Sequence, residues 1–95
     1  MTYLQVEWKH NIEDEPIEML SELDRRRNEI RKVERFRNGA ITFAGPNGAS
    51  GTTGLSETPI PEIVDIAADP QFHAATISKE DFEDCWQAAT ITVAA

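Results

Sequence analysis

Hydrophobic and polar positions alternate along the first ten residues of the chain. The apolar positions of this run are Leu4, Val6 and Trp8. A period of two is typical of a strand that buries one face, so we predict a strand over residues 3–10. The segment 11–16 combines a proline with three acidic residues and is predicted to be a loop.

The pattern over residues 17–37 is compatible with one helix and with two strands. Apolar residues recur in it at helical spacing, and its glutamates and arginines favour a helix. Read as strands, it divides into 17–23 and 30–37. The dipeptide Asn38-Gly39 fits either a hairpin turn or the end of a helix. The run 41–43 is β-branched and aromatic and needs a neighbouring strand, which favours the strand interpretation.

The second half of the chain predicts a loop, two helices and a tail. Residues 45–58 contain four glycines and one proline, which predicts a flexible loop with almost nothing to bury. A proline suited to the first turn of a helix begins the segment 61–68. A capping-box pattern starts a second helix over 78–89, whose apolar residues share one stripe. The tail 90–95 is predicted to fray or to extend an edge.

These elements predict a single α+β domain over residues 1–95. We expect a four-stranded, mainly antiparallel β-sheet over residues 3–45, with the helices 61–68 and 78–89 packed on one face. Residues 72–77 are a connector or a short strand. The expected core consists of Leu4, Val6, Trp8, Leu23, Ile30, Phe43, Ile66, Phe82 and Trp86.

The charge of the chain narrows its possible partners. Seventeen acidic and nine basic residues give a net charge of −8. The distribution is uneven, with −6 over residues 1–24, +5 over 25–56 and −7 over 57–95. Because phosphate binding needs a basic field, we expect no nucleic-acid partner. A basic protein, in contrast, would be attracted to this surface.

Membrane and secretory signals are not expected in this chain. No apolar run approaches the ~18 residues of a transmembrane helix, and the first residues lack the pattern of a signal peptide. The single cysteine, Cys85, fits a reducing compartment. We therefore expect a cytoplasmic protein that has no membrane partner.

The sequence matches phosphate-binding and metal-binding motifs only weakly. Residues 44–53 resemble the phosphate loop of ATP-binding cassette ATPases, but Ser50 and Gly51 stand where the motif needs glycine and lysine. His10, His73 and Cys85 lack the paired spacing of metal ligands. We expect no catalytic residue, no metal site and no cofactor.

Acidic residues are the candidates for a binding surface. They cluster in the loop after the first strand and on the last helix, as Glu13, Asp14, Glu15, Glu80, Glu83 and Asp84. Such clusters are often only a solvated face, but they would also suit a basic partner. Two alternatives stay open. One is a regulatory module that engages an acidic protein or RNA through the basic segment 25–37, and the other is an enzyme built around His10 and nearby acids.

Short motifs spread over most of the chain carry a family resemblance. They are Val6-Glu7-Trp8-Lys9-His10, Asp14-Glu15-Pro16, Ser21-Glu22-Leu23-Asp24, Ile30-Arg31-Lys32-Val33-Glu34, Phe36-Arg37, Gly39, Pro59-x-Pro61, Asp69-Pro70-x-Phe72 and Ile77-Ser78-x-x-Asp81-Phe82-Glu83-x-x-Trp86. On these motifs the chain resembles an uncharacterised family of small acidic bacterial proteins. It departs from that family in the tail 90–95 and at residues 25–27, where a more acidic or glycine-containing turn would be expected.

Some members of that family resemble immunity proteins of polymorphic or contact-dependent growth inhibition toxins. The resemblance therefore implies a single-domain α+β fold and a non-enzymatic immunity protein. Such a protein would bind and neutralise a cognate toxin domain, such as a basic nuclease, as a monomer in a heterodimer with the toxin. Its acidic surface would occupy the substrate-binding groove of the toxin or an adjacent surface.

Overall fold

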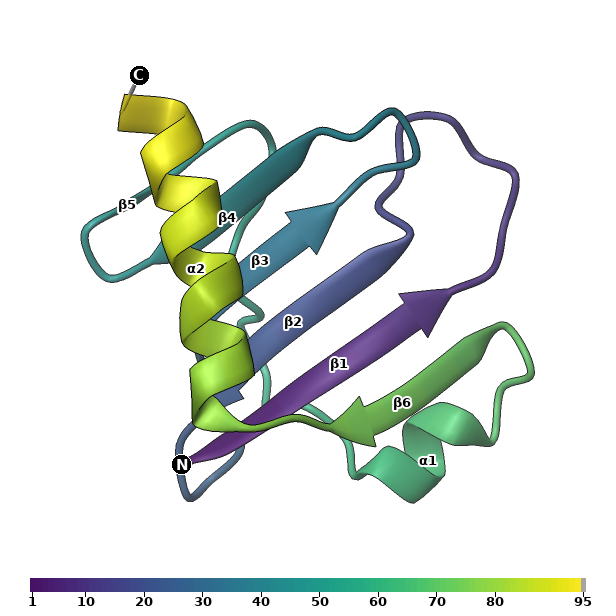
Figure 1. Ribbon diagram of the computed structural model, residues 1–95. Helices are drawn as coiled ribbons and strands as arrows, with labels where there is room; N and C mark the ends of the chain where they lie inside the picture. The colour runs from purple at the N-terminus through teal and green to yellow at the C-terminus, as the bar shows by residue number, and fades with distance from the viewer. Residues whose placement is uncertain (95) are drawn as a thin grey trace.

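Six antiparallel strands and two helices make up the computed structural model, which describes the backbone of residues 1–94 and the side chains of residues 1–91. The strands form one sheet in the order β5-β4-β3-β2-β1-β6 (Figure 1). They are β1 (Thr2–Trp8), β2 (Glu18–Leu23), β3 (Glu29–Arg35), β4 (Ile41–Gly45), β5 (Gly48–Ala49) and β6 (Phe72–Thr76). The helices are α1 (Ile63–Ala67) and α2 (Lys79–Ala94).

The sheet confirms the predicted α+β fold with antiparallel strands, but the predicted number of four strands is wrong. The glycine-rich segment turns back on β4 and adds β5, which pairs Ala49 with Ala44. The stretch between the helices adds β6, which pairs Phe72 with Trp8 of β1. As a result, β1 lies inside the sheet between β2 and β6.

The two helices occupy different places. α2 crosses one face of the sheet over β2, β3 and β4 (Figure 1). Ser78 Oγ accepts a hydrogen bond from the Asp81 N–H at 3.0 Å, which confirms Ser78 as the N-cap of the predicted helix. α1 instead contacts β6 at the sheet edge, so the predicted single layer of two helices is wrong. α2 also continues to Ala94, so residues 90–94 are helical rather than frayed, and Ala95 lies outside the described residues.

Residues 17–37 form the two strands β2 and β3, as the strand interpretation predicts. They pair antiparallel around a turn at residues 24–28. Asp24 Oδ1 accepts the N–H groups of Arg26 at 2.8 Å and Asn28 at 2.9 Å. The bonds with Asn28 hold the pKa of Asp24 below its ordinary value. A side chain that caps its own turn in this way is a local reason for a turn instead of a continuous helix.

Arg27 completes this turn in a conformation that glycine usually adopts. Its φ is 65°, in the left-handed region. Arg27 Nε donates to Ile60 O at 2.8 Å and Nη2 donates to Pro61 O at 2.7 Å. The Ile60 N–H donates back to Arg27 O at 2.8 Å. The arginine therefore holds the segment that leads into α1, which a glycine could not do.

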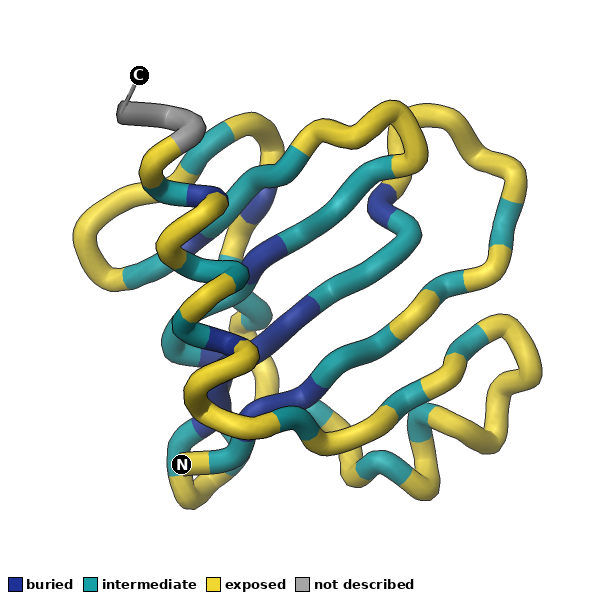
Figure 2. The backbone as a smooth tube through the Cα atoms, in the orientation of Figure 1, coloured by how far each residue is buried: buried dark blue, intermediate teal, exposed yellow. Residues whose placement is uncertain are grey.

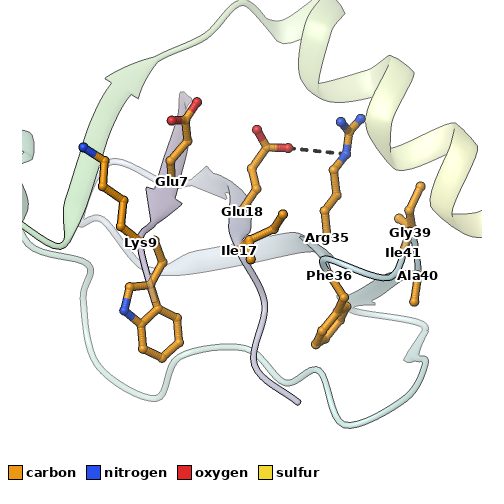
Figure 3. Close-up of a pocket in the computed structure, with 10 residues that line it drawn as sticks. Glu7, Lys9, Ile17, Glu18, Arg35, Phe36, Gly39, Ala40 and Ile41 are labelled. Carbon is orange, nitrogen blue, oxygen red and sulfur yellow. Dashed lines mark ion pairs between the residues drawn. The ribbon is translucent and has the colours of Figure 1, made fainter. Parts of the chain in front are cut away.

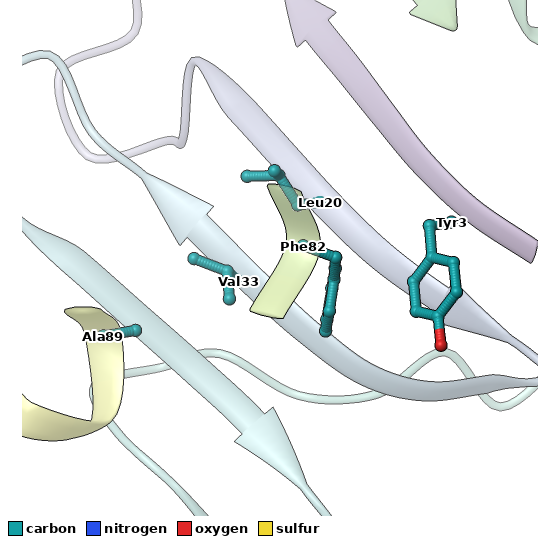
Figure 4. Packing of buried hydrophobic residues seen from close by; sticks show 5 residues of the cluster. All are labelled: Tyr3, Leu20, Val33, Phe82 and Ala89. Carbon is teal, nitrogen blue, oxygen red and sulfur yellow. The ribbon is translucent and has the colours of Figure 1, made fainter. Parts of the chain in front are cut away.

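Figure 2 shows the buried residues on the strands β1 to β4 and on α2. The strand register places their apolar side chains on both faces of the sheet. Under α2 the buried cluster is Tyr3, Leu20, Val33, Phe82 and Ala89 (Figure 4). Leu4, Leu23 and Ala44 are buried at alternate positions, on the opposite face. Of the predicted core, only Leu4, Leu23 and Phe82 are fully buried, and the rest is half-buried: Val6, Trp8, Ile30, Phe43, Ile66 and Trp86.

The segment 45–58 is tied to the sheet face that lies away from α2. Thr53 is only 6% exposed, and its Oγ1 donates to Glu34 Oε1 at 2.6 Å. Lys32 Nζ donates to Gly54 O at 3.1 Å. The Ser56 N–H donates to the buried Glu29 at 2.8 Å. The expectation of a loop with almost nothing to bury is therefore wrong, because its hydroxyl and backbone groups satisfy buried charges of β3.

We predict that Arg27→Ala lowers the free energy of unfolding by about 2 kcal/mol, because two charge-assisted hydrogen bonds to backbone carbonyls are lost. Arg27→Gly should lose about 1 kcal/mol less, because glycine relieves the left-handed strain. Urea unfolding measures both values. Arg26→Ala, at an exposed neighbour, is the control and should change stability by less than about 0.5 kcal/mol. Equal effects at Arg26 and Arg27 would contradict this anchoring role.

Candidate functional site

Arg31 projects from β3 toward α2 and binds carboxylates on both sides. Its Nε donates to Glu22 Oε1 at 2.6 Å, and its Nη2 donates to Glu22 Oε2 at 3.0 Å. The same guanidinium pairs with Glu83 of α2. Its central carbon lies 4.9 Å from the ring centroid of Phe82 and 5.0 Å from that of Trp86. Arg31 therefore joins α2 to the sheet by ion pairs and by cation–π contacts.

The ionisation of this cluster stabilises the fold. Hydrogen bonds from Arg31 hold the pKa of Glu22 below its ordinary value, and they do the same to the pKa of Glu83. Burial raises the pKa of Tyr3, whose hydroxyl donates to Glu22 Oε2 at 2.9 Å. Each charged group here already has its partner inside the molecule. The cluster is therefore a structural connection between α2 and the sheet.

Beyond α2, the same face of the sheet is open. Figure 1 shows the later part of β1 and β6 without a helix over them on this side. A hollow of about 630 Å³ lies at the end of the sheet where β1 and β3 end and β2 and β4 begin. Its lining includes Glu7, Glu18 and Arg35, and also Trp8, Ile17 and Phe36 at the alternating positions. In Figure 3 the side chains of Glu7, Glu18 and Arg35 project from the same side of the sheet, beside α2, whereas Phe36 projects from the other side. Glu7, Glu18 and Arg35 therefore border the hollow on the α2 side.

The strand register places these side chains in one row across the sheet. His73 of β6 is opposite Glu7 of β1, Glu7 is opposite Glu18 of β2, and Glu18 is opposite Arg35 of β3. Glu18 Oε1 lies 3.4 Å from Arg35 Nε, and Glu18 Oε2 accepts a hydrogen bond from Gln5 Nε2 at 2.5 Å. The row therefore contains two adjacent carboxylates, Glu7 and Glu18, and one cation, Arg35, which pairs with Glu18.

Glu7 and Glu18 oppose each other at the closer kind of cross-strand pair. The Trp8 N–H donates to Ile17 O at 2.9 Å, so the next pair, Glu7 and Glu18, is a non-hydrogen-bonded pair, in which side chains approach most closely. Like charges at such a position are destabilising. Among the side chains that the structure describes, none forms an ion pair or hydrogen bond with the Glu7 carboxylate.

Two further acids border the row from α2. Asp81, Asp84 and Cys85 line a second hollow of about 290 Å³ together with Glu18 and Arg35. Arg35 Nη2 donates to Cys85 Sγ at 3.3 Å. We call the whole region the open sheet face, and define it as Gln5, Glu7, Glu18, Arg35, His73, Asp81 and Asp84.

The predicted contact residues lie in two separate places. Glu13, Asp14 and Glu15 are exposed on the connection between β1 and β2, whereas Glu80 and Asp84 are exposed near the start of α2. Figure 1 shows these two regions at opposite ends of the sheet, so they do not form one patch. Glu83 is held by Arg31 and is therefore engaged inside the molecule. Only Asp84 of the predicted set belongs to the open sheet face.

Sequence reasoning missed the row of Glu7, Glu18 and Arg35. Their strands alternate, and the alternation assigned Glu7 only to a solvent-facing side. The signal that unites them is the register between the three strands β1, β2 and β3, which no local pattern contains.

The two histidines and the cysteine do not come together. His10 accepts the Ile12 N–H on Nδ1 at 3.0 Å, and its Nε2 lies 2.8 Å from Pro16 O. Both ring nitrogens of His10 therefore hold the loop after β1. Within the described residues, no group of three His, Cys, Asp or Glu side chains is placed to hold a metal ion.

The segment that resembles a phosphate loop is a hairpin between β4 and β5. A Cβ on Gly45 would come within 2.8 Å of Trp86 Cη2. This glycine is therefore required by the close approach of a tryptophan ring, and no helix follows the hairpin until Ile63. The helix N-terminus on which a phosphate loop depends is missing at this point of the described chain.

A family model matches residues 2–91 of the chain, and its description is domain of unknown function (DUF6881). The chain belongs to the DUF6881 family. This family match confirms the expected membership of an uncharacterised family, and it covers every strand, α1 and most of α2. No curated protein and no solved structure matches the chain. Within the described residues, no helix of this DUF6881 domain has the length and apolar character needed to cross a membrane.

We predict that Glu22→Gln lowers the free energy of unfolding. It should also make that free energy depend less steeply on pH in the acid range. Removing one charge from a largely buried pair should cost about 3 kcal/mol at pH 7. Because Arg31 lowers the pKa values of Glu22 and Glu83, the stability that they contribute is complete above about pH 4.3 and is lost as the pH falls through the lowered values. The variant should show a shallower loss of stability in this acid range.

The measurement is urea unfolding of the wild type and the variant between pH 7 and pH 2. Glu80→Gln removes an equal charge from an exposed position on α2. It should stay within about 0.5 kcal/mol of the wild type. An unchanged acid profile in Glu22→Gln would exclude the Arg31 cluster as the source of the acid sensitivity.

We predict that Glu7→Gln makes the isolated protein more stable, by about 0.5 kcal/mol, because it removes the repulsion between two directly opposed carboxylates. Thermal or urea unfolding at low ionic strength measures this gain. Glu13→Gln changes the net charge equally on an exposed loop, and it is the control that separates local repulsion from total charge. A loss of stability in Glu7→Gln would show that the glutamate has a partner of its own.

Proposed function

We propose that the protein is a non-enzymatic immunity protein that binds and neutralises a basic toxin domain. The observation that carries this proposal is the net charge of −8 on a small domain, whose exposed acids lie at both ends of the sheet and along the open sheet face. Such a field speeds the encounter with a basic protein and orients it. The sequence motifs resemble an uncharacterised family, some members of which resemble immunity proteins, and this supports the same role.

The proposed complex is a heterodimer of one copy of this chain and one toxin domain. Its exposed candidate contacts are Glu13, Asp14 and Glu15 at one end and Glu80 and Asp84 at the other. A toxin that binds nucleic acid has a basic groove, and an acidic surface that covers it excludes the nucleic acid by charge and by shape. The proposed site of action is the cytoplasm, where the lone Cys85 stays reduced.

The basic segment 25–37 offers less support for an acidic partner or RNA. Arg27 binds the carbonyls of residues 60 and 61, and Arg31 binds Glu22 and Glu83. Lys32 and Arg35 also bind groups of the chain. The two arginines that remain exposed at the turn are Arg25 and Arg26. Replacing this pair by glutamate tests the alternative without breaking the fold, and we expect toxin binding to survive it.

The experiment that tests the proposal is co-expression with the product of the neighbouring reading frame. We expect a stable complex and rescue of growth. No complex together with no rescue would overturn the immunity function.

The contribution of the acids is measured by the association rate of that complex. Glu80→Gln combined with Asp84→Asn should slow association by about fivefold at low salt, since steering depends on nearby charge. Glu57→Gln combined with Asp65→Asn removes the same total charge from exposed positions outside the proposed contacts, and should have a smaller effect. A rate that does not fall with added salt would remove electrostatic steering from the mechanism.

A further inference from the structure

The open sheet face differs from the other acidic surfaces because the fold itself fixes its charges in register. Glu7, Glu18 and Arg35 stand on three neighbouring strands at directly opposed positions. The acids of the loop at residues 13–15 have no such framework. A partner that recognises the spacing of the charges as well as their sign would therefore bind better to this fixed arrangement than to the loop at residues 13–15.

We propose that this face is where the basic partner docks, and that the partner places an arginine side chain between Glu7 and Glu18. The inference rests on the proposed binding function and gives it a location. An unpartnered sheet face whose central pair consists of two carboxylates is complementary in charge to a cation of the partner. Asp81 and Asp84 of α2 add to the same field from the border of the face.

The hydrogen-bonding groups of the row leave places for such a cation. Glu18 accepts one bond from Gln5 and lies near Arg35, and a carboxylate has about four acceptor positions in total. Glu7 is exposed, and the described side chains leave all its acceptor positions unused. One incoming guanidinium can therefore bond to both carboxylates at once.

Arginine fits this position better than lysine does. The guanidinium is a planar fork with five donors, whereas the lysine ammonium is a compact and strongly hydrated point charge. The two carboxylates project side by side from neighbouring strands (Figure 3), which suits a fork that spans two acceptors. Arg35 already pairs with Glu18 in the same row, so the incoming arginine would extend an alternation of charge toward His73.

Docking of a cation at this position also explains why Glu7 and Glu18 are both present, although the repulsion between their carboxylates destabilises the fold. The repulsion between Glu7 and Glu18 weakens the free protein, and a cation from the partner removes that repulsion on binding. A residue that lowers stability and raises affinity is typical of a binding site. A residue with a purely structural role would not show these opposite effects.

The test uses argininamide as the probe, so that it needs no toxin. Titration of argininamide into the ¹⁵N-labelled full chain should shift the amide signals around Glu7 and Glu18 on β1 and β2. Glu7→Gln should raise the half-saturating concentration at least threefold, whereas Glu57→Gln, at an exposed position outside the proposed contacts, should leave it within a factor of 1.5. Lysinamide should bind at least threefold more weakly than argininamide.

Three results would overturn the inference: shifts centred on residues 13–15, equal effects of the two substitutions, or equal binding of lysinamide. The complex from co-expression gives a second measurement, in which Glu7→Gln should weaken binding at least tenfold and Glu57→Gln less than threefold. If the complex forms and the two variants bind alike, the location is wrong and the immunity function stands. If no complex forms, the immunity function fails, while the argininamide titration still decides whether the face takes a guanidinium.

Discussion

The position of α2 depends on one cation that is largely removed from water. Arg31 has a side chain 17% exposed, and it is held between a carboxylate of the sheet and one of the helix, under two aromatic rings. The apolar cluster around Phe82 supplies the burial that holds α2 on the sheet, but apolar contacts alone would let the helix slide or rotate. The fork of Arg31 accepts only one placement of Glu22 and Glu83. It therefore fixes Glu83, and with it the first half of α2, relative to β2 and β3.

Local chemistry made several elements predictable from the sequence. The first strand follows from its alternation and the start of α2 from Ser78. The hairpin at Asn38-Gly39 follows from the β-branched run 41–43, which needs a neighbouring strand, because the dipeptide alone also fits a helix end. The strand order could not be predicted, because β6 pairs with β1 across more than sixty intervening residues and has no hydrophobic repeat of its own. The buried positions of Tyr3, Leu20 and Val33 were missed for a related reason. α2 covers part of one face and the segment 45–58 covers part of the other, so a single alternation could identify only one of the two buried sets.

At the candidate site, too, the composition of the chain predicts some features, whereas others depend on how the strands pair. Composition identified acidity as the dominant property of the surface, and it also led to Glu13, Asp14, Glu15 and Glu80, which are exposed as a binding role requires. It could not separate these residues from Glu83, whose charge is neutralised by Arg31. Nor could it reveal Glu7 opposite Glu18, because that opposition exists only once β1 and β2 are paired. Clusters of charge can be seen in a sequence, whereas rows of charge across strands are a property of the fold.

The pairing of β6 with β1 also has a consequence for how the protein is made. A strand near the beginning of the chain receives its second neighbour only from residues 72–76, and the helix that covers the sheet comes later still. Until residues 72–76 have left the exit tunnel of the ribosome, the nascent chain can have at most a partial sheet in which β1 is a bare edge. The face that α2 covers stays exposed until α2 has left the tunnel as well. We therefore expect this unfinished sheet to be the stage of synthesis most exposed to aggregation.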